Sequence, residues 1–157
     1  MPVFIADEQD LEADADDLLA LARHVVDQQR IPADMELSIL LVDADTIAGM
    51  NAQHLGKSGP TDVLAFPIDE PGESPPDTPA ILGDVVLCPA VAYVQADRLS
   101  RTPQEELRLL TVHGILHLTG MDHADPAAER AMFGLTDRLL ASYGGGDRAD
   151  VGSEDEP

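Results

Sequence analysis

Three histidines within one short segment, His113, His117 and His123, are the residues with the clearest chemistry in this sequence. His113 and His117 are four residues apart, so on a helix they lie about 40° apart around the axis and roughly 6 Å along it. Both imidazoles can therefore reach one ion. Gly120 is a natural helix terminator, and a turn there presents His123 as a third ligand. Three nitrogen ligands with an open fourth position are typical of catalytic zinc, so we expect one Zn²⁺ per chain at these residues.

Two simpler interpretations stand beside this one. A histidine on an apolar helix is often a satisfied core residue, and a pair with this spacing can arise by chance. A third histidine, with a glycine placed to redirect the chain, favours the metal site. Asp122 either accepts a hydrogen bond from the free N–H of a ligand histidine or caps the turn, and the sequence does not decide between these roles.

The spacing of the histidines also resembles that of the metzincin metalloproteases, which have H-E-x-x-H-x-x-G-x-x-H. Gly114 stands where those proteases have the glutamate that serves as general base. The missing carboxylate argues against peptide hydrolysis, so a metalloprotease is the less favoured alternative.

The elements that must position these residues alternate along the first half of the chain. Apolar runs typical of strands and stretches with helical spacing are separated by loops rich in turn residues. We expect strands at 3–6, 37–42, 63–66 and 81–87, and helices at 11–29, from Asp43 or Asp45 to about His54, after 88–89, at 102–119 and from 125 onward. Thr102-Pro103-Gln104-Glu105, with the pattern of a capping box, begins the helix that carries the first two histidines.

This order of elements predicts an α+β fold in a single domain. We expect a mixed sheet of about four strands packed against five or six helices, with the metal site at the C-terminal end of a central helix. The domain should span residues 1–143. Residues 144–157 are rich in glycine and acids and should form a disordered acidic tail.

Composition narrows the setting of the protein. The 157 residues suffice for one ordinary core, and Cys88, the only cysteine, leaves no partner for an internal disulfide. The N-terminal residues lack the pattern of a signal peptide, and no apolar run approaches the roughly 20 residues that span a membrane. We therefore expect a soluble, cytoplasmic protein without a membrane partner.

The net charge of −21 ordinarily argues against binding to nucleic acid, because that affinity comes largely from lysine and arginine. Many of the acids lie near the two ends of the chain, where they can serve solubility. A nucleic-acid partner would still need a locally positive face within a negative field.

The histidine segment resembles a known family. Residues 113–123 match H-G-x-L-H-L-x-G-x-D-H, the signature of the YbeY family of bacterial single-strand-specific endoribonucleases. Residues 59–67 and 82–88 are also similar to family segments, and the resemblance covers about residues 1–143. It implies zinc-dependent cleavage of single-stranded RNA in 16S rRNA 3′-end maturation and ribosome quality control. It also implies a ribosome or ribosome-associated protein as partner.

One departure from the family affects the remaining site. Family members usually have an arginine shortly before the Pro-Thr segment, a candidate for binding phosphate, but residues 51–58 contain none. Lys57 could replace it as a point charge, without the planar bidentate contact, or could be an exposed loop lysine. Beyond the metal-bound water, Lys57 and Asp122 are the candidate catalytic residues, and no general acid or base is assigned.

The candidate RNA-binding residues are Lys57, Arg98, Arg101 and Arg108. The three arginines surround the start of the metal-bearing helix and could form a basic face, or could be ordinary solvated charges. A noncatalytic, zinc-containing ribosome assembly factor is the alternative function from a different class.

Overall fold

Four strands form one mixed sheet in the order β1-β2-β4-β3 in the computed structural model, which describes residues 2–71 and 80–148. The β1-β2 and β2-β4 pairs are parallel, and β3 pairs antiparallel with β4. The elements in chain order are β1 (Val3–Asp7), α1 (Ala15–Gln28), β2 (Met35–Leu41), α2 (Ala44–Leu55), β3 (Val63–Pro67), β4 (Ala80–Leu87), α3 (Pro89–Arg98), α4 (Pro103–Leu118) and α5 (Pro126–Arg148). The predicted α+β class and its four-stranded mixed sheet are confirmed, with five helices in the described residues.

Local side-chain chemistry explains where the helices begin. Asp43, one of two candidates in the sequence, caps α2 by accepting a hydrogen bond from the Thr46 N–H at 2.8 Å. Thr102 and Glu105 form the reciprocal capping box at the start of α4. The carboxylate of Asp125 accepts from the Ala128 N–H at the start of α5. Each cap satisfies backbone donors that the first helical turn leaves without a partner.

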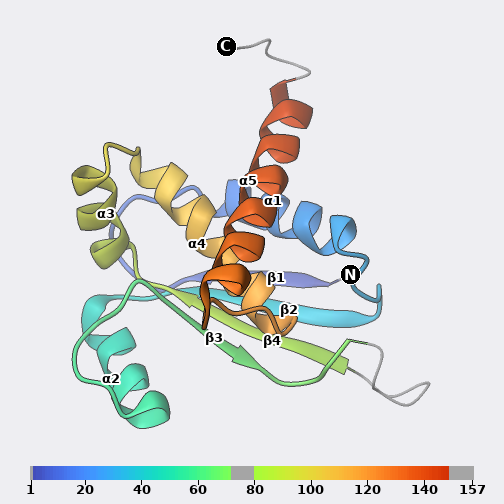
Figure 1. Ribbon diagram of the computed structural model, residues 1–157. Helices are drawn as coiled ribbons and strands as arrows, with labels where there is room; N and C mark the ends of the chain where they lie inside the picture. The colour runs from blue at the N-terminus through green and yellow to red at the C-terminus, as the bar shows by residue number, and fades with distance from the viewer. Residues whose placement is uncertain (1, 72–79, 149–157) are drawn as a thin grey trace.

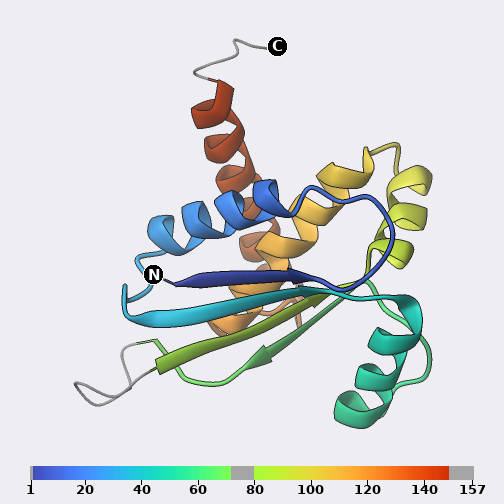
Figure 2. The same cartoon turned by 180° about the vertical axis from the view of Figure 1, so that it is seen from behind.

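The helices divide unequally between the two faces of the sheet (Figures 1 and 2). Helices α1, α4 and α5 cover one face, α3 packs beside α4, and α2 lies against the opposite face at one end. The main core fills the space under α1, α4 and α5. In β2 the buried positions alternate with half-buried ones, as expected where one face is covered more completely than the other.

Helix α4 is the central helix of this layer. It packs on β3 and β4 and contacts α1, α3 and α5. Nine of its residues are buried, so most of its circumference is covered by other elements. A helix held on so many sides gives its side chains fixed directions, which suits the placement of a reactive site.

Helix α5 runs to Arg148, so the backbone of residues 144–148 is helical although we expected the tail to begin at residue 144. Adding a residue to an existing helix gains one hydrogen bond per residue fixed, which allows a helix to continue beyond its packed part. The rest of the predicted tail, residues 149–157, lies outside the described residues. Within residues 2–71 and 80–148, no helix has the length and apolar character needed to cross a membrane.

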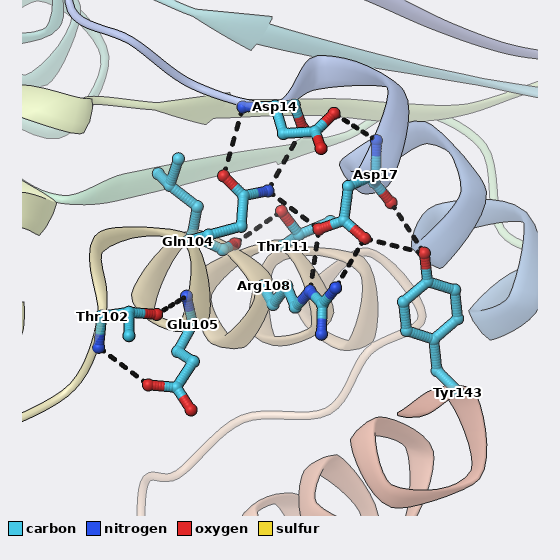
Figure 3. A network of polar contacts seen from close by, with 9 residues as sticks. Asp14, Asp17, Thr102, Gln104, Glu105, Arg108, Thr111 and Tyr143 are labelled. Atoms are coloured by element: carbon cyan, nitrogen blue, oxygen red, sulfur yellow. Dashed lines mark hydrogen bonds and ion pairs between the residues drawn. The ribbon is translucent and has the colours of Figure 1, made fainter. Parts of the chain in front are cut away.

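A polar network ties α1, α4 and α5 together on the side away from the sheet (Figure 3). The Arg108 guanidinium donates to both carboxylate oxygens of Asp17 at 2.8 Å, and the Tyr143 hydroxyl donates to the same carboxylate at 2.8 Å. Gln104 adds a fourth donor to Asp17. Burial alone would raise the pKa of Asp17, but hydrogen bonds from Arg108, Gln104 and Tyr143 together hold the pKa below its ordinary value.

We expect Asp17→Asn to lower the free energy of unfolding by about 2 kcal/mol at pH 7. The substitution removes the charge-assisted bidentate contact with Arg108 and weakens the network that joins α1, α4 and α5. Because the pKa of Asp17 is lowered, this contribution is present above about pH 3.8 and disappears as the pH falls further. Urea unfolding curves measure the difference. The exposed neighbour Asp16 supplies the matched control, and equal effects of Asp16→Asn and Asp17→Asn would contradict the assignment.

Candidate metal centre

The three predicted ligands line one open pocket of about 720 Å³. The pocket lies between the C-terminal half of α4, the loop that follows it, strand β3 and the first turns of α5. The lining side chains combine imidazoles, carboxylates, one lysine and apolar groups. They include Leu55, Lys57, Asp62, Val63, Ala65, His113, His117, Asp122, His123, Glu129 and Phe133. His123 thus lines the same pocket as His113 and His117, and metal binding by the three residues stays a prediction.

The chain reverses immediately after α4, as the position of Gly120 predicts. The Gly120 N–H donates to the His117 carbonyl at 3.0 Å, and the Met121 N–H donates to the Leu116 carbonyl at 3.1 Å. Gly120 has φ of +101°, a backbone conformation that side chains with a Cβ rarely adopt. This turn brings His123 beside His117, with the two ring centroids 5.5 Å apart and the rings edge to face.

His113 is the most buried of the three predicted ligands, and one of its ring nitrogens has no hydrogen-bond partner. Its Nε2 is buried, and within the described part of the chain it has no hydrogen-bond partner. Burial and the neighbouring His117 and His123 lower the pKa of His113, while Asp62 and Asp137 act in the opposite direction. A neutral imidazole with a buried, unpartnered nitrogen is suited to donate that nitrogen's lone pair to a cation.

His117 is also held neutral at ordinary pH. Partial burial and the nearby His123 lower its pKa, and a hydrogen bond with the Met121 backbone partly offsets the effect. A backbone partner of this kind fixes the ring orientation and tautomer of a ligating histidine.

The imidazoles present suit a divalent cation of the zinc type in their chemistry. Within residues 2–71 and 80–148, however, no group of three or more His, Cys, Asp or Glu side chains is placed so that it could hold a metal ion. Two imidazoles on one tetrahedral ion, with Zn–N of about 2.0 Å, would have ring centroids roughly 5 Å apart. The separation of His117 and His123 is close to that value, and the buried Nε2 of His113 supplies a third donor. The three-histidine ligand set stays a prediction.

Gly114 has a packing role that the sequence comparison with proteases did not reveal. A Cβ on Gly114 would lie 2.6 Å from Cγ1 of Val85 in β4, well inside van der Waals contact. Helix α4 can therefore approach the sheet only because residue 114 has no side chain. A glutamate at this position would meet the same obstacle, which is a structural reason for the absence of the protease base.

Asp62, at the start of β3, is a pocket residue that we did not single out from the sequence. Its carboxylate accepts hydrogen bonds from the Val63 N–H at 2.8 Å, the Thr61 hydroxyl at 3.2 Å and Gln95 Nε2 at 3.1 Å. Three donors fix its orientation beside His113. The only sequence signal was its place within the family-like segment 59–67, because Asp-Val by itself is unremarkable.

Lys57 and Asp122, the two candidate catalytic residues, both lie at the rim of the pocket but differ in their contacts. Lys57 lines the pocket and is exposed, and Leu55, two residues earlier, is 51% exposed at the same rim. The Asp122 carboxylate accepts from the Ala124 N–H at 3.1 Å, which is the turn-capping role, and it also lines the pocket.

The three candidate arginines do not form one basic face. Arg98 and Arg101 border a neighbouring groove that also contains His113. Arg101 precedes α4, so it does not share a helical face with Arg108. Arg108 is committed to the Asp17 network and packs over the Tyr143 ring at 5.3 Å.

Known proteins similar to this chain belong to the family that the histidine segment resembles. Residues 4–144 match the family model described as "Endoribonuclease YbeY". A Salinispora tropica protein named "Endoribonuclease YbeY" is 50% identical over 151 residues, which cover 91% of this chain and 96% of the relative. A protein of the same name from Acidothermus cellulolyticus is 53% identical over 150 residues, 91% of this chain and 92% of the relative. The solution structure of TM1509 from Thermotoga maritima superposes with a TM-score of 0.61 at 27% identity, covering 95% of this chain and 93% of that chain.

Gly114→Ala should reduce the free energy of unfolding by about 2 kcal/mol, because its methyl group forces α4 away from β4. The matched control is Gly49→Ala in α2, where a Cβ meets nothing within 4 Å and a small gain of about 0.5 kcal/mol is expected. Chemical denaturation measures both. The cost of Gly114→Ala should shrink in a Val85→Ala background, and full additivity of the two changes would argue against the contact.

The metal-free protein should lose stability as the pH falls below about 6.5. The unfolded chain then takes up protons at His113 and His117, whereas the folded chain resists protonation because both pKa values are lowered. Urea unfolding in a chelator at pH 7.5 and pH 5.5 tests this, with His113→Gln expected to weaken the dependence. An unchanged dependence in that variant would show that other groups are responsible.

Proposed function

The chain belongs to the YbeY family of endoribonucleases, and we propose that it cleaves single-stranded RNA at a metal ion held by His113, His117 and His123. It is a hydrolase of RNA, and its family acts in ribosomal RNA maturation. The finer assignment is processing of the 16S rRNA 3′ end and ribosome quality control. The observation that carries the metal assignment is the buried Nε2 of His113, which has no hydrogen-bond partner among the described residues and belongs to a side chain that lines the same pocket as His117 and His123.

The family is metal-dependent, and we assign one Zn²⁺ per chain. Neutral imidazoles are suitable zinc ligands, and the lowered pKa values of His113 and His117 keep both rings neutral at physiological pH. When bound, such an ion supplies Lewis-acid stabilisation of charge that develops at phosphorus and lowers the pKa of water.

The chain's own side chains bind and orient the substrate around that centre. Lys57 is the one cation in the pocket lining among the described residues, so it attracts the phosphate and offsets part of the carboxylate field. Asp62 is held in place by three donors beside His113 and accepts a proton or hydrogen bond from a group on the substrate side. Asp122 shapes the turn that presents His123.

A ribosomal or ribosome-associated partner helps to hold the RNA. The chain carries −21, and its bases near the site are few, so naked RNA gains little from counterion release. A partner that already binds the RNA supplies the affinity that this surface lacks. We place this work in the cytoplasm, in the domain formed by residues 1–143, with residues 144–157 as an acidic extension.

Peptide hydrolysis is not proposed, because Gly114 lies where a side chain would collide with β4. A noncatalytic zinc-containing assembly factor would use the same histidines for structure alone. Substitution of His117 separates that role from catalysis.

His117→Ala should abolish stoichiometric zinc and reduce cleavage of a defined single-stranded RNA at least a hundredfold, because the site loses one of three ligands. His24→Ala is the matched control. His24 lies in α1, is hydrogen-bonded to Ser142 and does not line the histidine pocket. Metal analysis and gel-based cleavage rates are measured on the same preparations. A His117→Ala protein that folds, loses zinc and still cleaves RNA like the wild type would refute the catalytic role. Normal support of ribosome maturation by that protein would point instead to an assembly factor.

A further inference from the structure

Phe133 in α5 is an exposed aromatic residue at the edge of the histidine pocket. The chain has three phenylalanines, two tyrosines and no tryptophan, so aromatic side chains are scarce. Phe133 nevertheless keeps 43% of its surface accessible. No other Phe, Tyr or Trp of the described residues lines this pocket or the smaller groove beside it.

The Phe133 ring is fixed against the candidate metal ligand His113. The two rings are stacked, with centroids 5.2 Å apart and planes inclined by 19°. Its neighbour Met132 is fully buried and anchors this turn of α5 in the core. The ring is therefore a rigid platform, and little conformational entropy is lost when a ligand covers its exposed surface.

A groove of about 220 Å³ continues from this platform toward the start of α4. It is lined by Arg101, Leu109, His113, Phe133, Thr136 and Asp137. His113 and Phe133 also line the histidine pocket, so the two spaces share a wall. A molecule bound in the groove would lie directly beside the reacting centre.

Arg101 gives the groove a positioned positive charge. Its guanidinium donates to Glu106 at 2.8 Å, and Glu106 is only 3% exposed, whereas the Arg101 side chain is 40% exposed. Gln95 Nε2 donates to the second oxygen of Glu106 at 3.2 Å. The buried carboxylate thus holds one edge of the guanidinium and leaves the exposed part directed to solvent, where it can meet a phosphate.

We propose that this groove is a nucleotide subsite in which an unpaired base stacks on Phe133 and its phosphate lies on Arg101. The inference rests on the proposed function, since it assigns a place to the RNA next to the scissile bond. A flat apolar ring beside a cation matches the two parts of a nucleotide, and every base can stack on such a ring. Asp137 repels phosphate and accepts hydrogen bonds from base N–H groups, so the base belongs at the Phe133 end.

The subsite also explains why the RNA must be single-stranded. A base inside a duplex is stacked between its neighbours and hydrogen-bonded along its edge, so its face is covered. Only an unpaired nucleotide can place its base on Phe133 while its backbone passes the histidines. Phe133 is therefore a specificity-determining residue.

The test uses a short single-stranded RNA whose cleavage position has first been mapped with the wild-type holoenzyme. Two further substrates carry one abasic nucleotide, on either side of that position. We expect an abasic nucleotide on one side to reduce kcat/KM about tenfold, the usual scale of one base stacked on an aromatic ring. Phe133→Leu should cost the same factor on intact RNA, mainly through KM, and show no further loss on the abasic substrate. Phe133→Tyr, which keeps the ring, should retain the abasic penalty that Phe133→Leu loses.

Phe4→Leu is the matched control, because Phe4 lies in β1 and is also exposed. Zinc content and circular dichroism accompany each variant. Equal abasic penalties in wild type and Phe133→Leu would overturn the subsite while leaving the nuclease function intact. So would a wild-type enzyme indifferent to abasic nucleotides on both sides, a result that needs no variant to fold. Absence of RNA cleavage by the wild-type holoenzyme would instead overturn the proposed function and the subsite together.

Discussion

The close approach of α4 to β4 at Gly114 is the constraint on which the site depends. The helix that carries His113 and His117 lies directly on the sheet because Gly114 has no Cβ, for which Val85 leaves no room. This contact sets the depth of His113, and that depth desolvates the imidazole and lowers its pKa. It also brings His113 level with Asp62 at the start of β3, with which it shares the pocket. A larger residue at position 114 would change the spacing between the helix and every group opposite it.

Two acidic residues, Asp17 and Glu106, position two of the few bases of this chain. Asp17 engages Arg108 on the far side of α4, and Glu106 engages Arg101 near the groove. The first pair is structural, because its partners tie three helices together, whereas the second leaves 40% of the Arg101 side chain exposed. The distinction shows that a count of arginines near the metal-bearing helix says little about RNA binding. What matters is which oxygen atoms already occupy each guanidinium.

Much of the fold could be predicted because local signals agreed with one another. The apolar runs predicted the strands. Thr102 and Glu105 predicted the start of α4, and Gly120 predicted its end. Those signals depend on neighbouring residues, which a sequence displays directly. The pocket residues Asp62 and Phe133 could not be found in this way, because each reaches His113 from a different part of the chain. The role of Gly114 was likewise hidden, since the sequence does not say which strand faces it.

Without the arginine usual in the family, the site has its positive charge at two separate places. Within residues 51–58 the rim of the pocket presents the apolar Leu55 and the single cation Lys57. Arg101 lies on the opposite side of His113, in the groove beyond Phe133. A phosphodiester backbone that crosses the histidines can thus meet one cation in each space, Lys57 in the histidine pocket and Arg101 in the groove. Two separated charges cannot grip one phosphate as a bidentate guanidinium does, but they can align successive phosphates along the strand. In the proposed subsite, Lys57 and Arg101 would therefore set the path of the RNA rather than hold one phosphate.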